Sequence, residues 1–241
     1  MLKDKNFLEF EKIFLHNNNL KKISPDLADI DKDFDYTNLI IETPYSSSQN
    51  FCQEKLYGNY GNNNFIYLHN DTYKALSNAL SLAKKQNLKI KIWDGYRPFE
   101  VQAFMTEKHP DFVEQGFVSH PLEGVATHVR GIAVDLTLSN LQNQELEMGS
   151  EFDEMSDKSH HDSKNISNLA IKNRDILIEI MLKAGFQKYQ EEWWHYHLPI
   201  LDIQSDGSYR VNKISAEKYP KILDKFPELL SDEVKQFFNL K

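Results

Sequence analysis

Two short segments contain the residue types that a catalytic metal site needs. In the first, His128 and Asp135 stand seven residues apart around Gly131. In the second, Glu192 precedes His195 by three residues. Imidazole nitrogens and a carboxylate oxygen are ordinary ligands of a catalytic zinc, which keeps one position open for water. A glutamate next to such a ligand can act as the base for that water, so the pattern indicates metal-assisted hydrolysis.

The spacing of the first pair constrains the backbone. On one straight strand the two side chains would lie roughly 23 Å apart and on opposite faces, which is too far to share an ion. The chain must therefore reverse between them, and Arg130-Gly131 is the place where a turn costs least. We expect a strand ending near His128, a tight turn, and a returning strand from Ile132 to Leu138 that carries Asp135.

The second pair raises a different question of geometry, because positions three apart on an unbroken strand face opposite ways. We therefore expect Glu192 on a bend, or just before the strand that carries His195. His197 lies on the same strand face as His195 and is an alternative third ligand, but the spacing from Glu192 favours His195. The remaining histidines lack metal-binding neighbours, and we interpret them as surface or core residues.

Each candidate residue also has an ordinary structural explanation when it is considered alone. Asp135 can cap a turn, and His128 can be a hydrogen-bonded core histidine. Arg97 can pair with a carboxylate, and the aromatic pair Trp193-Trp194 can fill the core. Only the combination of these segments, in this order, indicates catalysis specifically.

The hydrophobic pattern predicts strands interleaved with two substantial helices. The first helix begins at Asp71, which can cap it, and Pro98 suits the first turn of a shorter helix from Phe99 to about Lys108. A long polar loop covers residues 44–65 and is a candidate for lining a site. The other expected elements are strands at 39–41 and 88–92, a helix at about 166–184 ended by Gly185, a strand with His195, and short helices at 215–219 and 231–240.

This order of elements predicts one α+β domain, in which helices pack against a mostly antiparallel sheet that carries the metal site. Residues 37–204 form the catalytic domain in this interpretation. An N-terminal arm covers residues 1–36, and a C-terminal helical extension covers residues 205–241.

Composition disfavours several classes of function. The formal net charge of -8 and the pI of about 5.6 disfavour nucleic acid as a partner, because binding phosphates needs a basic surface. No window approaches the ~20 apolar residues of a membrane span. The apolar core of a signal peptide is absent after Met1, and Cys52 is the single cysteine, so no intramolecular disulfide can form. Together these features favour a cytoplasmic protein.

Three motifs, taken in order, resemble a known family. They are Asp94-Gly95-Tyr96-Arg97-Pro98, then His128-x2-Gly131-x-Ala133-x-Asp135, then Glu192-x2-His195. Together they resemble the D-alanyl-D-alanine dipeptidases of the VanX type. This family lies within a zinc peptidase superfamily that also holds D,D-carboxypeptidases and hedgehog-like domains. The similarity spans roughly residues 37–200.

The resemblance implies one zinc ion per chain and a role for each site residue. The zinc would be held by His128, Asp135 and His195. Glu192 would be the catalytic base, and Arg97 would stabilise the transition state. The reaction implied is hydrolysis of the D-Ala-D-Ala dipeptide to free D-alanine by a metal-bound water that the glutamate activates.

Two further residues concern the substrate, which is a small dipeptide in this interpretation. Asp153 matches a position that faces the substrate ammonium in the family. The family usually has Ser-x-His before its first ligand, whereas this chain has Ala126-Thr127-His128. The serine hydroxyl is therefore lost, and Thr127 is the expected substrate-binding hydroxyl nearby.

Two alternatives stay open at this point. A D,D-carboxypeptidase, or another cell-wall peptidase acting on longer peptides, would use the same metal chemistry. A non-catalytic zinc-binding domain, as in the hedgehog-like relatives, would need neither Glu192 nor Arg97. The presence of both residues argues against that second alternative, and Asp153 argues for a short substrate with a free N-terminus.

Overall fold

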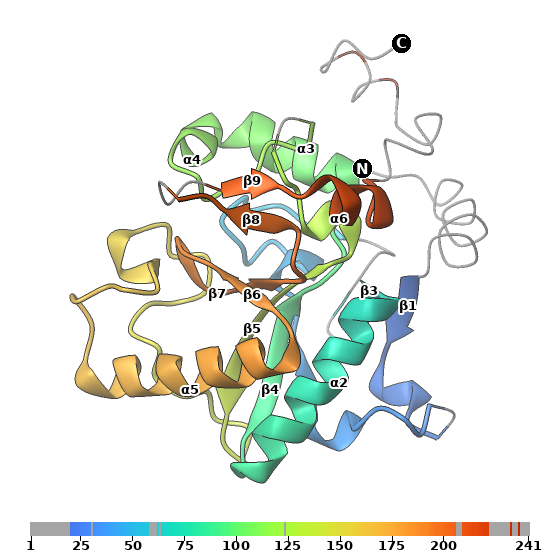
Figure 1. Cartoon of the computed structure of the whole chain (residues 1–241), viewed down its shortest axis with the longest axis vertical. Helices are drawn as coiled ribbons and strands as arrows, with labels where there is room; N and C mark the ends of the chain where they lie inside the picture. The colour runs from blue at the N-terminus through green and yellow to red at the C-terminus, as the bar shows by residue number, and fades with distance from the viewer. Residues whose placement is uncertain are drawn as a thin grey trace.

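A five-stranded mixed sheet forms the centre of the chain (Figure 1). The structure is a computed structural model, which describes residues 20–29, 31–57, 62, 64–122, 124–205, 209–221, 232 and 236. The strands lie in the order β2 (Leu39–Ile41), β4 (Lys89–Asp94), β5 (Ala133–Ser139), β7 (Glu192–His197) and β6 (Gln187–Tyr189). The pairing of β2 with β4 is parallel, and the other three pairings in this sheet are antiparallel.

Two long helices, α2 (Asn70–Lys85) and α5 (Asn168–Ala184), lie side by side against this sheet, as Figure 1 shows. Apolar side chains at i, i+3 and i+4 spacing give each helix a face that the sheet buries. The resulting core includes Leu76 and Leu177 from the helices and Ile92 and Leu136 from the strands. The prediction of an α+β fold with helices against a mostly antiparallel sheet is confirmed.

Two small two-stranded sheets accompany the central one. β1 (Leu20–Ile23) pairs antiparallel with β3 (Ile66–His69), and β8 (Leu201–Ile203) pairs with β9 (Tyr209–Val211). β1 was not predicted, and its Ile23 is buried in the main core. The remaining helical elements are α3 (Phe99–Lys108), α4 (Pro110–Glu114), α6 (Lys213–Lys218), and the 3-10 turns η2 (Pro25–Leu27), η3 (Tyr36–Asn38), η4 (Pro44–Ser46), η5 (His128–Arg130) and η6 (Asp157–Ser159).

Most predicted elements are present, with differences at their ends. The cap of α2 is His69 and not Asp71, because the His69 ring Nδ1 accepts a hydrogen bond from the Asp71 N–H at 3.1 Å. α5 ends as predicted at Gly185, which has a φ of 101°. The helix predicted at 231–240 lies outside the described residues, apart from single positions. Each helix among the described residues is too short or too polar to span a lipid bilayer.

The prediction of a strand that ends near His128 is wrong. Residues His128–Arg130 form the single 3-10 turn η5. The turn closes on itself, because the Gly131 N–H donates to the His128 carbonyl at 2.9 Å and the Ile132 N–H donates to the Thr127 carbonyl at 3.1 Å. Gly131 has a φ of 69°, and a Cβ there would lie 2.7 Å from a Leu20 methyl carbon. The predicted reversal at this glycine is therefore present, but it joins a turn, and not a hairpin strand, to β5.

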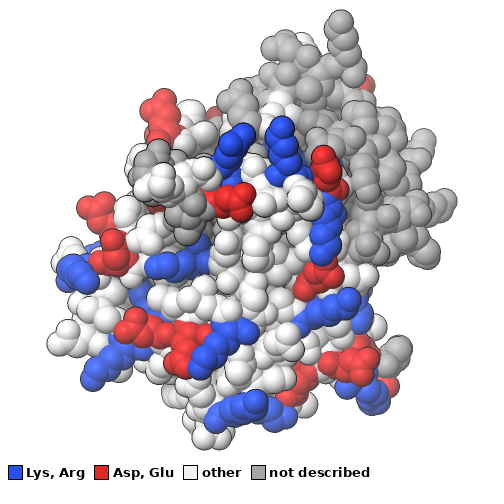
Figure 2. Space-filling view, viewed as in Figure 1, with Lys and Arg blue, Asp and Glu red and all other residues white. Residues whose placement is uncertain are grey.

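Charges of both signs are mixed on the face of the molecule that Figure 2 shows. On the face shown in Figure 2, Lys and Arg side chains lie among Asp and Glu side chains. The residues coloured there therefore produce no large field of a single sign that would attract a polyanion.

Candidate functional site

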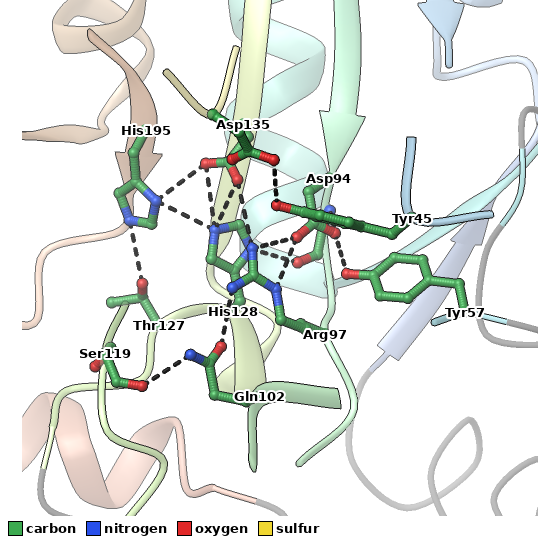
Figure 3. A network of polar contacts seen from close by, with 12 residues as sticks. Tyr45, Tyr57, Asp94, Arg97, Gln102, Ser119, Thr127, His128, Asp135 and His195 are labelled. Atoms are coloured by element: carbon green, nitrogen blue, oxygen red, sulfur yellow. Dashed lines mark hydrogen bonds and ion pairs between the residues drawn. The ribbon is translucent and has the colours of Figure 1, made fainter. Parts of the chain in front are cut away.

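Three buried side chains from three elements form a group with the geometry of metal ligands (Figure 3). His128 comes from η5, Asp135 from β5 and His195 from β7, where Asp135 and His195 are paired across the two strands. The His128 Nε2 and His195 Nδ1 atoms lie 3.2 and 3.0 Å from Asp135 Oδ1, and 3.1 Å from each other. The ligand atoms all lie within 4.8 Å of one another, so one cation can contact all three.

The outer nitrogen of each imidazole is held by another group. His128 Nδ1 lies 2.7 Å from the Gly95 carbonyl, which can only accept, so this nitrogen carries the proton and Nε2 presents its lone pair to the group. His195 Nε2 lies 3.2 Å from the Thr127 hydroxyl. Such partners fix the ring orientation of histidines that bind metals. The structure therefore places Thr127 on His195, whereas its predicted contact with substrate stays a prediction.

The carboxylate of Asp135 is held in its ionised form. Burial alone would raise the pKa of Asp135, but the imidazoles of His128 and His195 outweigh that effect and hold the pKa well below its usual range. An ionised oxygen is the form that a divalent cation needs.

Glu192 is the first residue of β7, and its Oε2 lies 3.7 Å from His195 Nδ1. The two side chains reach the same space because the pairing with β6 is irregular. Lys188 of β6 pairs with Tyr196, whereas the next residue, Tyr189, pairs with Glu192. The extra residues of β7 between these pairs interrupt the regular pattern in which successive side chains of a strand point to opposite faces of the sheet. Glu192 and His195 can therefore point to the same side. The predicted bend at Glu192 thus corresponds to a shift in the register between β6 and β7. Burial raises the pKa of the Glu192 carboxyl well above the usual value.

Arg97 is held in place before any substrate arrives. Its Nε and Nη2 donate to Asp94 Oδ2 at 3.0 and 2.7 Å, and its Nη1 donates to Gln102 Oε1 at 3.0 Å. Nη2 also lies 3.7 Å from Asp135 Oδ2 in the ligand group. Burial opposes the charge, but Asp94 and the other acidic groups nearby hold the pKa of Arg97 above its ordinary value. The guanidinium is therefore a fixed positive charge beside the candidate metal position.

The partners of Arg97 include residues that the sequence did not identify as functional. Asp94 Oδ1 accepts hydrogen bonds from the Tyr57 hydroxyl and, at 2.7 Å, from the Gly95 N–H. Tyr57 comes from the long loop predicted at 44–65. The position of Asp94 in the Asp-Gly-Tyr-Arg-Pro motif, three residues before the arginine, was a usable signal. Tyr57 lies in a segment that shares the similarity to the family, but no role was predicted for it.

Asp153 lines the same cavity as the ligand group and has a backbone φ of 59°, a region that few residues other than glycine adopt. Its Oδ2 accepts a hydrogen bond from the buried Tyr45 hydroxyl at 2.9 Å. Burial raises the pKa of Asp153 to about 7. Tyr45 also lies against Arg97, whose guanidinium carbon is 5.3 Å from the ring centroid. The tyrosine was not predicted, and it links the two charged ends of the site.

All seven predicted site residues line one cavity of about 440 Å³. The cavity wall also includes Tyr45 and Phe51, so the loop at 44–65 does line the site. The aromatic side chain of Trp194 also lines the cavity. The predicted residues that the cavity brings together are Arg97, Thr127, His128, Asp135, Asp153, Glu192 and His195.

The alternative ligand His197 does not join the metal group. Its Nδ1 lies 2.8 Å from the backbone carbonyl of Leu198, and burial lowers its pKa to about 3. The ring is near His195, with centroids 5.7 Å apart. The geometry therefore agrees with the spacing argument that favoured His195.

A family model described as D-ala-D-ala dipeptidase matches residues 26–209 of this sequence. The chain belongs to this family. Members are metallopeptidases, so this dipeptidase-family chain is a hydrolase. The resemblance inferred from the three motifs is confirmed.

Several relatives carry the name D-alanyl-D-alanine dipeptidase. The one from Escherichia coli (strain K12) is 32% identical over 196 residues, covering 81% of this chain and 90% of its own length. The one from Enterococcus faecalis (strain ATCC 700802 / V583) is 39% identical over 126 residues, which cover 44% of this chain and 60% of the relative. The one from Enterococcus faecium is 37% identical over 144 residues, covering 52% and 69%.

Among solved structures, this dipeptidase-family chain is similar to the LD-carboxypeptidase LdcB. The sequence identity is 19%, the TM-score is 0.36, and the match covers 73% of this chain and 70% of the other. That likeness is too distant to support any conclusion about substrate.

Proposed function

We propose that this chain hydrolyses the D-Ala-D-Ala dipeptide to free D-alanine with one zinc ion held by His128, Asp135 and His195. The observation that carries the proposal is the convergence of three ligand atoms, a glutamate and a buried guanidinium in one cavity. The names of the relatives support the choice of substrate.

The donor set supports zinc as the metal. Two imidazole nitrogens and one carboxylate oxygen suit a catalytic zinc with one open position, and both imidazoles have a partner on their outer nitrogen. When bound, zinc would polarise the scissile carbonyl and lower the pKa of the attacking water. The remaining steps belong to the side chains of the cavity.

Glu192 is the proposed base. Its Oε2 would accept the proton of the attacking water and then return it to the nitrogen of the leaving amine. A raised pKa helps with the second step, because the protonated carboxyl must persist long enough to donate. The aromatic rings of Trp194 and Tyr45, which line the same cavity, would limit the number of other water molecules near this carboxyl.

Arg97 is the proposed stabiliser of the negative charge that develops on the carbonyl oxygen. Its contacts with Asp94 and Gln102 fix it in advance, so no reorganisation is needed when the charge forms. The 3.7 Å distance between Nη2 and Asp135 Oδ2 supports this role, because a carbonyl oxygen bound to the metal would also lie beside the ligand group.

Asp153 is the proposed partner of the substrate ammonium. A carboxylate at this position of the cavity, oriented by Tyr45, would attract a free N-terminus and reject a blocked one. This favours a dipeptidase over a D,D-carboxypeptidase, whose peptide substrates continue beyond that point. The family assignment likewise favours catalysis over a non-catalytic zinc-binding domain.

The test is the release of free alanine from D-Ala-D-Ala, L-Ala-L-Ala and N-acetyl-D-Ala-D-Ala, each with and without a metal chelator. We expect cleavage of D-Ala-D-Ala alone, loss of that activity with chelator, and its return when zinc is added. Cleavage of the acetylated peptide instead would replace the proposal with a carboxypeptidase. Cleavage that chelator leaves intact would contradict the metal mechanism.

Asp153 should also set the acid limit of the reaction. The carboxyl must be ionised to bind an ammonium, so kcat/KM for D-Ala-D-Ala should fall as the pH drops through its pKa. Burial places that pKa near 7, and the metal charge acts in the opposite direction, so we expect the fall between the ordinary value of 3.8 and about 7. Asp153→Asn should raise KM and remove the part of this fall in kcat/KM that Asp153 causes, leaving the part that protonation of the base Glu192 causes. Asp157→Asn, an exposed change nearby, should leave the whole pH profile as in the wild type. If kcat/KM of Asp153→Asn falls at acid pH in the same way as that of the wild type, the fall belongs to the titration of another group.

A further inference from the structure

The last described segment of the chain contacts the loop that forms one wall of the cavity. This wall, called the rim loop, comprises residues 119–122 and 124–127, and most of its residues line the cavity. The contacting residues follow β9 and α6 and lie beyond position 209, where the family match ends. Figure 1 places α6 at the same end of the molecule as β8 and β9. A part of the chain outside the family match thus supports the proposed site.

Lys221 makes the central contact. The side chain is buried, with 6% of its surface exposed. Its ammonium donates hydrogen bonds to the carbonyls of Leu122 and Gly124 at 2.7 and 2.8 Å. Hydrogen bonds from a charged donor are stronger than neutral ones. Lys221 therefore draws two points of the rim loop toward one fixed position.

Arg130 adds a second connection between the same parts. Its Nε donates to the Val125 carbonyl of the rim loop at 2.7 Å, and its Nη1 donates to the Tyr219 carbonyl at 2.5 Å. Arg130 is also the last residue of η5, the turn that begins with His128. The C-terminal segment, the rim loop and the turn carrying a candidate ligand are thus joined.

Tyr219 anchors the segment to the body of the domain. The ring is buried in the main core, and its hydroxyl donates to Asp71 Oδ2 of α2 at 3.0 Å. The ring also packs edge-on against His69, with centroids 4.9 Å apart. Lys221 follows two residues later, so its ammonium acts from a fixed base and not from a free tail.

The rim loop in turn touches groups of the proposed reaction. The Ser119 carbonyl accepts a hydrogen bond from Gln102 Nε2 at 2.8 Å, and Gln102 is the residue that holds Arg97. At the other end, Thr127 lies on His195. Between them, Ala126 has a φ of 49°, a conformation that an alanine keeps only when its surroundings enforce it.

We infer that Lys221 is a positioning residue for substrate binding, which holds the rim loop in the shape that the dipeptide needs. The inference rests on the proposed function. Asp94 and the Gly95 carbonyl hold Arg97 and His128 independently of the rim loop. Loss of the Lys221 contact should therefore weaken binding much more than the chemical step.

The experiment compares Lys221→Met, which keeps the apolar stem and removes the ammonium, with Lys213→Met, an exposed change on α6. Hydrogen exchange of the peptide covering residues 119–127 is measured by mass spectrometry, together with KM and kcat for D-Ala-D-Ala. We expect faster exchange in the rim loop and a KM raised about tenfold in Lys221→Met, with kcat within about twofold of the wild type. Lys213→Met should match the wild type in all three.

Each outcome is decisive for the inference. Unchanged exchange and KM in Lys221→Met would overturn it, as would equal changes in the Lys213→Met control or a loss confined to kcat. If Lys221→Met does not fold, Lys221→Gln, which keeps an N–H donor but no charge, is measured with the same expectations. An inactive wild type would instead overturn the proposed function, and the exchange measurement would still test the contact.

Discussion

Glu192→Gln is expected to lower kcat for D-Ala-D-Ala by about 10²–10⁴-fold, the usual contribution of general acid–base catalysis. The amide has the size of the carboxylate but cannot accept a proton from water. Zinc content should stay at the wild-type value, because the ligand atoms belong to His128, Asp135 and His195. The measurement combines initial rates with metal analysis of the purified variant. Glu191→Gln, at the adjacent half-buried position, is the matched control and should keep full activity.

The same substitution should not weaken the fold. Burial raises the pKa of Glu192 in the folded protein, so the folded state binds the proton more tightly than the unfolded chain does. The ionised carboxylate therefore destabilises the fold above the unfolded pKa, and a neutral amide relieves that effect. At neutral pH the metal-free variant should have a Tm equal to or above that of the metal-free wild type. A low kcat together with a clearly lower Tm would indicate structural damage and not the loss of a base.

The candidate site residues could be named from the sequence because the proposed metal-assisted hydrolysis uses few residue types and because their motifs resemble those of a known family. Two histidines, an aspartate and a glutamate at short spacings restrict the backbone strongly, and the reversal at Gly131 followed from that restriction alone. The form of the reversal did not follow, since a 3-10 turn and a hairpin both bring the two ligands together. The sequence likewise predicted that the chain must bend at Glu192. It did not predict the register of β6 and β7 that produces the bend.

Several partners of the site residues could not be predicted from the sequence, because they come from distant parts of the chain. Tyr45 and Asp153 are 108 positions apart, and Lys221 reaches Gly124 across 97. Local patterns predict which face of a strand or helix is buried, but they do not specify which buried groups meet. β1 was missed for the same reason, since a short strand is stabilised by its pairing with β3 and not by its own composition.

Arg97→Ala is expected to lower kcat by about 10²–10³-fold, the range found when one donor to a developing oxyanion is removed. The effect of this substitution on stability must be measured separately from its effect on kcat. The substitution leaves Asp94 buried, with the Tyr57 hydroxyl and the Gly95 N–H as its remaining donors. Removing one member of a buried pair typically costs about 3–5 kcal/mol. Rates should therefore be measured well below the Tm of the variant, with circular dichroism to confirm the fold.

Arg97→Lys separates charge from geometry at the same position. Lysine keeps a positive charge near Asp94 but lacks the planar fork that contacts Asp94 and Gln102 together. If preorganised charge beside the ligand group is what Arg97 supplies, Arg97→Lys should recover part of the stability but only a minor part of kcat. Full recovery of kcat would mean that charge alone suffices. A loss confined to KM in both variants would show that Arg97 binds substrate and transition state equally, and its role as a stabiliser of the oxyanion would then be withdrawn.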